Sequence, residues 1–380
     1  MAFALITGTR PEIIKMFPVM RAFDSEGIDY KFIHTGQHHD YELFLKFIED
    51  LNIKIPDYNI SLASSSGPIE QLSEMISKIG SVLKEIKPSS VIIQGDTNSV
   101  VASGLAAIKS RIPVVHLEAG LRSYDLRTPE EYNRRIVDHM SNVLFAPTIQ
   151  SERNLEKEQV PGRIFMVGNT IVDAVKLGMQ LMSTKRSHMY GIKESILSKI
   201  KPTLDPSKCV LLTLHREENV DNQDSLRQIL SALTDSGLHY ICPMHPRTVK
   251  KIHEFGLEGL VSSTVKIIEP VGYFDLLALL KTCRFVISDS GGIQEEVTSP
   301  FIDKHALILR NSTERPESVA SGHTIMCPID YNEIKKSIRK IDLGELPKKL
   351  NFSPYGDGNS AHKIVEILKN PMIPIQCKIV

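Results

Sequence analysis

The sequence predicts an α/β protein of two domains, each with a parallel sheet covered by helices. Short apolar runs typical of buried strands alternate with longer segments of helical periodicity along most of the chain. Its 380 residues exceed what one hydrophobic core usually supports, and a hydrophobic fraction of 42% is ample for two. A polar, basic stretch punctuated by proline interrupts the alternation near the middle of the chain. We place the boundary just before it and expect one domain at residues 1–170 and a second at residues 171–356.

The first domain opens with an apolar strand and a helix start. Residues 3–6 form the strand, Gly8 ends it, and Pro11 suits the first turn of the helix that follows. Later apolar runs predict strands at residues 31–35, 91–94, 113–117, 144–147 and 164–167. Helical patterns fall between them at about residues 41–47, 69–87, 100–110, 130 onward and 169–182. This alternation predicts parallel strands joined by helices.

The second domain repeats the alternation without repeating the sequence. Strands are expected at residues 209–214, 240–243, 265–268, 285–288 and 306–309. A glycine-containing loop then leads to an amphipathic helix at about residues 357–372. We expect this terminal helix to pack back on the first domain.

Composition excludes several classes of function. Lys plus Arg and Asp plus Glu both number 45, so no overall field favours nucleic acid or a membrane surface, and any anion must be bound locally. The five cysteines stand far apart without paired spacing, so we expect no metal site. The first turn, GTRPEIIK, lacks the G-x-G-x-x-G fingerprint, so we expect no nicotinamide cofactor. The chain enters a strand at once, without a leader or a long apolar run, which favours a cytoplasmic protein.

Residues 285–296, reading FVISDSGGIQEE, predict a strand, a tight turn and a helix start. Ser290, Gly291 and Gly292 would present unhindered backbone N–H groups at the positive end of the helix, where a phosphate binds well. Glu296, one turn further along, is placed to accept hydrogen bonds from sugar hydroxyls. An ordinary strand-to-helix connection that uses glycine for its geometry explains these residues equally well.

Two successive strands of the first domain end in a carboxylate. Asp96 follows one strand and Glu118 the next, and the carboxyl ends of parallel strands meet at the edge where ligands bind. A charged loop then leads to Glu130 at the start of a helix. The alternative is a solvated surface loop followed by the usual preference for an acid at a helix N-terminus.

His215 ends a strand of the second domain, where we expect it to face the same cleft as the glycine turn. Histidine suits a group that must both give and take a proton, although a lone histidine at a strand end is more often structural. Arg315 follows another strand end and could add a fixed cation beside the turn. Together with Arg10 and the turn it would clamp a diphosphate between the domains.

Three acids facing a diphosphate site describe a site that moves protons on a sugar while it holds the nucleotide. Carbon 2 of a hexose has no adjacent carbonyl, so its proton is not acidic enough for simple removal. Transient oxidation would need the nicotinamide that this chain is not expected to bind, whereas elimination of the nucleotide to a glycal-like intermediate would not. Elimination needs anion stabilisation at the departing diphosphate, with His215 as a candidate acid. Inversion then needs proton-handling groups on both faces of carbon 2.

Seven spaced motifs, GDTNSV, HLEAGLRS, TPEEYNRRIVDH, VGNTIVDA, HREEN, DSGGIQEE and TERPE, together with GTRPEIIK, resemble those of the non-hydrolysing UDP-N-acetylglucosamine 2-epimerases. They occur in the family's order and span nearly the whole chain. The resemblance implies two Rossmann-like halves of the GT-B type facing across a cleft, interconversion of UDP-GlcNAc and UDP-ManNAc, no metal, no nicotinamide and a homodimer.

The resemblance also implies roles for individual residues. Asp96, Glu118 and Glu130 match the proton-handling acids, and His215 matches a residue near the leaving diphosphate. The family's nucleotide-binding positions match Arg10, Lys15, Ser290, Gly291, Gly292, Glu296 and Arg315. Its aromatic residue near the uracil falls at Leu276, so Phe274, two residues earlier, is our candidate for the base.

Two regions depart from the bacterial pattern. Glu217 stands where bacterial members often have a second arginine in HRREN, and the segment after GQH also differs. Both regions help to form a regulatory site for a second substrate molecule in the bacterial proteins. The sequence therefore does not favour allosteric activation by substrate.

Four alternative functions remain open. A hydrolysing 2-epimerase would release free N-acetylmannosamine, and its relatives resemble this chain less well at the first turn and at GDTNSV. A GT-B glycosyltransferase would need an acceptor site in the first domain, and a non-catalytic sugar-nucleotide sensor would not need the three acids. A 2-epimerase for a UDP-linked diacetamido uronic acid stays open because no residue is identified that selects at carbons 3 and 6.

Overall fold

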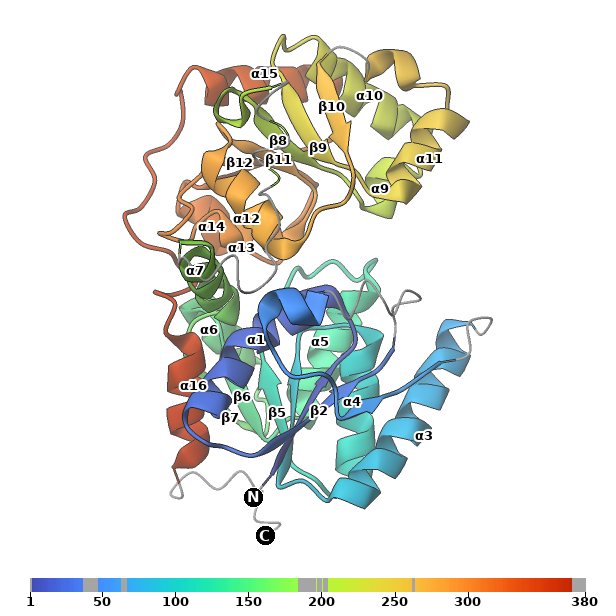
Figure 1. Ribbon diagram of the computed structural model, residues 1–380, viewed down its shortest axis with the longest axis vertical. Coiled ribbons are helices and arrows are strands. Elements are labelled where there is room, and N and C mark those ends of the chain that lie inside the picture. Colours follow the sequence, from blue (N-terminus) through green and yellow to red (C-terminus); the bar gives the residue numbers. More distant parts are fainter. Residues whose placement is uncertain are drawn as a thin grey trace. The chain divides into compact units, whose positions relative to one another are not determined.

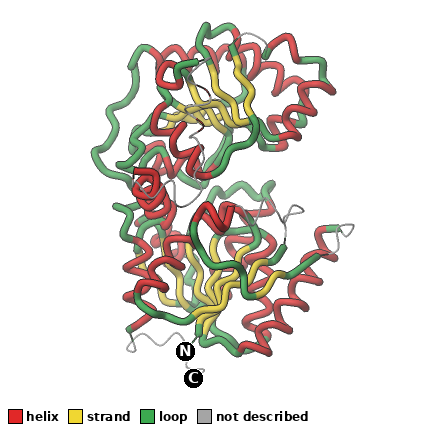
Figure 2. The backbone as a smooth tube through the Cα atoms, in the orientation of Figure 1, coloured by secondary structure: helices red, strands yellow, loops and turns green. Residues whose placement is uncertain are grey.

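The computed structural model describes residues 2–36, 47–62, 67–183, 196, 200, 204–261 and 264–370. The chain divides into two compact units: the first contains the described residues up to Leu177 and those from Tyr355 onward, and the second contains those from Gly178 to Pro354. Each unit has a layer of strands between helices, as Figure 2 shows. Among the described residues, no helix is both long and apolar enough to cross a membrane.

The first unit contains a seven-stranded sheet in the order β3-β2-β1-β4-β5-β6-β7, and every neighbouring pair is parallel (Figure 1). The central strands β1 and β4 are buried along their whole length because both faces of the sheet are covered. The sequence did not predict β3, which has two residues and no apolar run. The strands are β1 (Phe3–Thr7), β2 (Tyr30–His34), β3 (Tyr58–Asn59), β4 (Ser90–Gln94), β5 (Val114–Leu117), β6 (Val143–Ala146) and β7 (Arg163–Met166).

Helices cover both faces of this sheet. In Figure 1, α3, α4 and α5 lie side by side, while α1 packs with the terminal helix α16. An Asp173 carboxylate oxygen accepts a hydrogen bond from the Ala361 N–H at 2.9 Å and anchors the start of α16. The helix expected at residues 41–47 lies almost wholly outside the described residues. The helices are α1 (Arg10–Ser25), α3 (Pro68–Ile86), α4 (Asn98–Lys109), α5 (Pro129–Met140), α6 (Ile149–Lys157), α7 (Thr170–Ser183) and α16 (Ser360–Lys369).

The second unit contains a six-stranded parallel sheet in the order β10-β9-β8-β11-β12-β13. The edge strand β13 was not predicted from the sequence. The strands are β8 (Val210–Thr213), β9 (Tyr240–Pro243), β10 (Val265–Ile268), β11 (Val286–Ser288), β12 (Ala306–Leu309) and β13 (Thr324–Cys327). The α-helices are α9 (Glu217–Val220), α10 (Gln223–Thr234), α11 (Pro246–Glu254), α12 (Tyr273–Thr282), α13 (Gly291–Glu296), α14 (Pro316–Ala320) and α15 (Tyr331–Asp342). Short 3₁₀ turns lie at η2 (Pro206–Lys208) and η3 (Glu258–Leu260).

Both sheets contain a topological switch point, where consecutive connections leave a central strand in opposite directions. In the first unit β1 pairs with β2 on one side and β4 on the other, and in the second unit β8 pairs with β9 and β11. Open parallel sheets bind ligands at the carboxyl ends of the strands that flank such a point. The turns after β1, β4, β8 and β11 are therefore where a site is expected.

Gly120, in the loop after β5, provides a test of how tightly the first unit is packed. Its φ is +83°, and an added Cβ would lie 2.3 Å from the Ser151 carbonyl oxygen. We expect Gly120→Ala to reduce the free energy of unfolding by about 2–5 kcal/mol, because the left-handed backbone and the contact with rigid backbone both oppose a side chain. Urea unfolding followed by circular dichroism measures the change.

Gly80→Ala is the matched control, since Gly80 lies inside α3 and an added Cβ there meets nothing within 4 Å. This variant should stabilise the protein by about 0.5–1 kcal/mol, because alanine favours a helix over glycine. Equal urea midpoints of unfolding for Gly120→Ala and Gly80→Ala would show that the loop after β5 can relax around a methyl group.

Candidate active site

Asp96 lies at the switch point of the first unit, directly after Gly95, whose φ is +89°. Its carboxylate accepts hydrogen bonds from the Arg134 guanidinium, at 2.8 Å from Nε and 2.7 Å from Nη2. The Asn133 side-chain amide donates to the Asp96 carbonyl at 2.8 Å. Because 29% of the Asp96 side chain remains exposed, helix α5 holds the carboxylate in place without closing it off from solvent.

Glu118 follows β5 and adopts a left-handed backbone with φ +68°. Its side chain is 6% exposed and forms an ion pair with Lys15. Gln94, the last residue of β4, and Asn169, at 3.4 Å, also donate hydrogen bonds to the Glu118 carboxylate. Lys15, Gln94 and Asn169 are all donors, and donors are the partners that an ionised carboxylate takes. The strained backbone is of a kind that recurs at functional sites.

Glu130 and Glu131 both lie in the first turn of α5 but have different surroundings. Glu131 is fully buried and accepts hydrogen bonds from the Ser123 N–H at 2.9 Å and from Arg134 at 2.9 Å. Glu130 is exposed, and it forms no hydrogen bond or ion pair with another described residue. Glu131 therefore positions the loop and Arg134, while Glu130 is the acid available to a ligand.

Glu12 is a buried acid that our sequence reasoning missed. Its side-chain oxygens accept hydrogen bonds from the Gly8 N–H at 2.7 Å, Thr9 Oγ1 at 2.9 Å and Thr97 Oγ1 at 2.8 Å. It thereby joins the turn after β1 to the turn after β4. Burial, with a smaller contribution from the charge of Asp96, raises the pKa of Glu12 to about 7. The Thr-x-x-Glu spacing of a capping box was the available signal.

Arg10, the first residue of α1, is exposed, and its guanidinium lies over the Phe47 ring at 4.8 Å from the centroid. Lys15, one turn further along α1, is buried in its ion pair with Glu118. The two cations of α1 that were predicted to bind the nucleotide therefore differ in how accessible they are to a ligand. Arg10 is accessible, whereas Lys15 acts on the carboxylate beside it.

In the second unit, the turn after β11 begins α13. The Ser290 N–H donates to Ser288 Oγ at 2.9 Å, so one of the three predicted amides is already used. Across the described chain, no group accepts a hydrogen bond from the Gly291 or Gly292 N–H. A Cβ on Gly291 would lie 2.6 Å from an Arg315 guanidinium nitrogen, so glycine leaves the space in which Arg315 approaches the turn.

Arg315 is buried at the turn and is paired with acids. Its Nε lies 2.8 Å from a Glu295 oxygen, and its Nη1 pairs with Glu314. Arg310 also pairs with Glu314, at 3.0 Å. The cation beside the glycine turn is therefore held in a fixed orientation, as the sequence predicted for Arg315, but within a cluster whose acids balance its charge.

His215 follows β8, and the buried carboxylate of Asp289 holds it. Its Nδ1 lies 3.0 Å from Asp289 Oδ1, and the backbone N–H groups of His215 and Arg216 donate to the same carboxylate at 3.1 and 3.0 Å. Burial acts to raise the pKa of Asp289, but these hydrogen bonds and the charge of His215 outweigh it, and the pKa is lowered. About half of the His215 side chain is exposed, so its Nε2 edge is available to a ligand.

Asp289 is a site residue that we did not single out, although it precedes Ser290 directly. Glu296 and Phe274, both predicted to bind substrate, are buried, at 5% and 7% exposure. Burial and the nearby Glu296 carboxylate together raise the pKa of Tyr273. The Phe274 ring packs beside Gly178, where an added Cβ would lie 3.4 Å from it.

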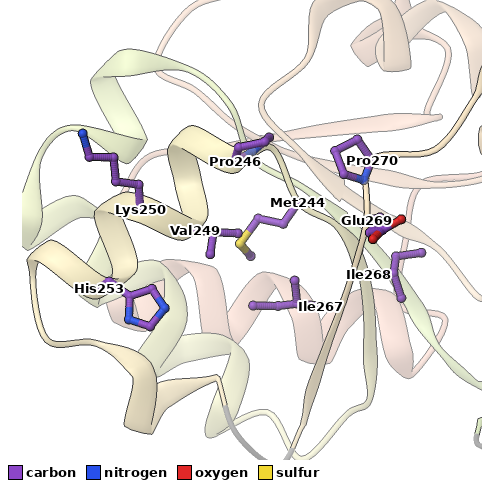
Figure 3. Close-up of a pocket in the computed structure, with 9 residues that line it drawn as sticks. All are labelled: Met244, Pro246, Val249, Lys250, His253, Ile267, Ile268, Glu269 and Pro270. Carbon is purple, nitrogen blue, oxygen red and sulfur yellow. The ribbon is translucent and has the colours of Figure 1, made fainter. Parts of the chain in front are cut away.

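A separate hollow in the second unit lies between α11 and the edge strand β10 (Figure 3). It is lined mainly by apolar side chains, with Lys250 and Glu269 pointing away from one another at its rim, and includes none of the predicted site residues. In the sheet order β10 lies three strands from β11, which is roughly 14 Å. The lining residues are Met244, Pro246, Val249, Lys250, His253, Ile267, Ile268, Glu269 and Pro270.

Within the described ranges, no three His, Cys, Asp or Glu side chains lie close enough together to form a metal site.

A family model described as UDP-N-acetylglucosamine 2-epimerase matches residues 21–369. The chain belongs to this family. It is 40% identical over 376 residues to the UDP-N-acetylglucosamine 2-epimerase of Methanocaldococcus jannaschii, an alignment that covers 97% of this chain and 99% of the relative.

Solved structures of family members match this epimerase over nearly their full length. The M. jannaschii UDP-GlcNAc 2-epimerase in complex with UDP-GlcNAc and UDP has a TM-score of 0.85 at 38% identity, covering 97% of this chain and 99% of that one. The Neisseria meningitidis enzyme bound to UDP-GlcNAc also scores 0.85, at 35% identity and coverages of 97% and 100%. These matches confirm the predicted family and its GT-B-like fold of two Rossmann-like domains.

One relative of this epimerase acts on a different sugar. The UDP-2,3-diacetamido-2,3-dideoxy-D-glucuronate 2-epimerase of Pseudomonas aeruginosa is 32% identical, and the alignment covers 97% of this chain and 99% of the relative. The family thus includes members whose names specify different substituents on the sugar.

Glu12 predicts a pH dependence of the epimerase's stability. A carboxyl whose folded pKa is raised from 4.5 to about 7 contributes stability that is complete below about pH 4.5 and lost as the pH rises through about 7. Relative to Glu12→Gln, the free energy of unfolding of the unaltered protein should therefore fall by on the order of 3 kcal/mol between pH 4 and pH 8. Urea unfolding across this range measures the difference.

Glu70→Gln provides the matched control for Glu12→Gln. Glu70 occupies the same position in the first turn of α3 as Glu12 does in α1, but it is exposed. The Glu70→Gln variant shows how much the free energy of unfolding changes when a helix N-terminus loses an exposed acid. Parallel stability curves for Glu12→Gln and the unaltered protein would contradict the raised pKa of Glu12.

Proposed function

We propose that this enzyme is a non-hydrolysing UDP-N-acetylglucosamine 2-epimerase that interconverts UDP-GlcNAc and UDP-ManNAc. The observation that carries the proposal is the position of the predicted residues at the two switch points. Asp96 lies at the first, Glu118 follows the neighbouring strand β5, and Glu130 begins the helix α5. His215 and the Ser290–Gly292 turn lie at the second. Membership of the family described as UDP-N-acetylglucosamine 2-epimerase supports UDP-GlcNAc as the substrate.

The proposed reaction is elimination followed by re-addition. A carboxylate of the first unit removes the proton from carbon 2, the bond between carbon 1 and the diphosphate oxygen breaks, and UDP leaves with the electron pair. This leaves 2-acetamidoglucal. UDP then attacks carbon 1 again while another acid delivers a proton to the opposite face of carbon 2. The three acids differ in partner and exposure, which suits opposite tasks in proton transfer.

Charge develops on UDP during elimination, and the second unit is the proposed place where it is stabilised. Asp289 Oδ1 orients His215, and a protonated ring would donate from its Nε2 edge to the leaving diphosphate. The Gly291 and Gly292 amides and Arg315 would bind the phosphates, with Ser290 shaping the turn. The same groups must retain UDP until re-addition.

The remaining predicted residues receive binding or supporting roles in this proposal. Arg10 would bind the diphosphate, and Lys15 would hold the Glu118 carboxylate in place beside the substrate. Glu296 and Phe274 would bind the ribose and uracil. We also propose a cytoplasmic homodimer that supplies UDP-ManNAc for polysaccharide biosynthesis.

A second candidate substrate is a UDP-linked 2,3-diacetamido uronic acid. The relative from Pseudomonas aeruginosa carries this substrate in its name and matches almost the whole chain. The elimination would be the same because the change lies at carbons 3 and 6. Identity to the UDP-GlcNAc 2-epimerase of M. jannaschii is higher, at 40% against 32%, and this favours UDP-GlcNAc.

Incubating the purified protein with UDP-GlcNAc in deuterated water tests the proposal. Deuterium at carbon 2 of intact UDP-GlcNAc and UDP-ManNAc, followed by NMR and mass spectrometry, is the expected result. Free N-acetylmannosamine together with UDP would instead identify a hydrolysing enzyme. An absence of exchange with UDP-GlcNAc, but exchange with the diacetamido uronic acid, would select the second candidate.

Replacing the acids singly tests their proposed chemistry. Asp96→Asn, Glu118→Gln and Glu130→Gln should each slow deuterium exchange at carbon 2 by about 100-fold or more, because each removes a proton-transfer group. The dissociation constant of UDP, measured by calorimetry, should change by less than about threefold. Loss of UDP binding would move that residue from catalysis to recognition.

Glu333→Gln is the control for these substitutions, since it removes an exposed glutamate from the first turn of α15 in the second unit. Its exchange rate should match that of the unaltered protein. A comparable loss of rate in this variant would show that the effect of an amide substitution does not depend on the site.

Asp289→Asn tests the orientation of His215. An amide would direct hydrogen atoms at the N–H donors that now surround the carboxylate, so the ring would lose its fixed orientation. We expect kcat to fall by about 10- to 100-fold with little change in KM. The matched control is Asn219→Ala, because Asn219 donates to the same carboxylate at 3.2 Å without touching the His215 ring. If both variants lose the same fraction of kcat, the role of Asp289 is structural.

A further inference from the structure

His116 is a buried histidine in the middle of β5 that the proposed mechanism does not use. It is 1% exposed, and both ring nitrogens have partners. Nδ1 lies 2.8 Å from Asp138 Oδ1, and Nε2 lies 2.9 Å from the Gly95 carbonyl oxygen. A carboxylate and a carbonyl only accept hydrogen bonds. Two such bonds therefore require a hydrogen on each ring nitrogen, which makes the ring an imidazolium.

The groups around His116 include two acids and one arginine. Asp138 is fully buried, and its second oxygen lies 2.8 Å from Arg122 Nη1. Arg122 in turn forms two hydrogen bonds with Glu158, at 2.9 and 2.6 Å. Burial acts to raise the pKa of Asp138, but the hydrogen bond and charges from His116 and Arg122 outweigh it, and the pKa is lowered. Two acids, one arginine and a charged ring sum to zero. With a neutral ring the two acids would share one arginine, and Asp138 is fully buried while the Glu158 side chain is 21% exposed.

This network connects the three segments that carry the proposed acids. His116 holds the carbonyl of Gly95, the residue before Asp96. Glu118 lies two residues after His116, and the Gly120 N–H beyond it donates to Asp138 Oδ2 at 3.1 Å. Asp138 belongs to α5, whose first turn carries Glu130.

We propose that His116 is a positioning residue, held as an imidazolium, that fixes the spacing of the Asp96, Glu118 and Glu130 segments. It touches none of the reacting atoms. Its effect on the chemistry rests on the proposed function. The charge on the ring does not, and it can be measured independently.

Two substitutions separate the contacts of the ring. Glutamine places its amide nitrogen near the position of Nε2 and retains a donor for Gly95, whereas asparagine places its amide nitrogen near the position of Nδ1 and retains a donor for Asp138. His116→Asn should lower kcat by about 10- to 100-fold with less than a threefold change in KM, because misplaced acids slow proton transfer without weakening UDP binding. His116→Gln should retain at least about tenfold more activity. Equal losses in the two variants, with equal falls in the thermal midpoint, would overturn the positioning role.

Long-range proton–nitrogen NMR of the labelled protein tests the imidazolium without reference to catalysis. At pH 7.5 both ring nitrogens of His116 should show the shifts of protonated nitrogens, and the assignment follows from the signal lost in His116→Gln. A signal typical of an unprotonated ring nitrogen would overturn the proposal. If the imidazolium is found but the unaltered protein exchanges no deuterium into either sugar nucleotide, the proposed function fails while the charged network stands.

Discussion

The candidate site depends on the pairing of β1 with β4 and of β8 with β11. Each pairing brings together two strands that are distant in the sequence, and their connecting segments leave the sheet in opposite directions. A crevice at the carboxyl ends of such strands follows from the topology and does not require a special loop. Both units use this arrangement, and the turns at these points carry Asp96 in one and His215 in the other.

Polar groups at the ends of buried strands must find partners, because an unpaired charge is costly away from water. Asp289 is satisfied by two backbone N–H groups and the His215 ring, and Glu118 by Lys15, Gln94 and Asn169. The same contacts that satisfy these carboxylates also fix their orientation. The stability of these turns and the geometry of the candidate site therefore have a common cause.

Although the chain has no net charge, it places individual cations where an anion could bind, and neighbouring acids hold these cations in position. Arg315 lies against Gly291 while Glu295 and Glu314 hold it. The arginine is thus oriented before a ligand arrives, and less conformational freedom remains to be lost on binding. Among the groups to which the proposed reaction assigns proton transfer, Glu130 and one edge of His215 are exposed, whereas Glu118 is buried.

The sequence by itself determined the alternation of strands and helices, most strand positions, the family, and the acids and glycines that end the strands. These features are local, since apolar runs and turn residues are read from neighbours in the chain. Only the tertiary structure decided which residues become partners. Thr97 reaches Glu12 across 85 positions, and the His215 N–H reaches Asp289 across 74. The short strands β3 and β13 likewise exist because neighbouring strands pair with them. Hydrogen bonding in a parallel sheet joins segments that are remote in sequence, so the environment of a strand-end carboxylate is set by the sheet order and not by its neighbours in the chain.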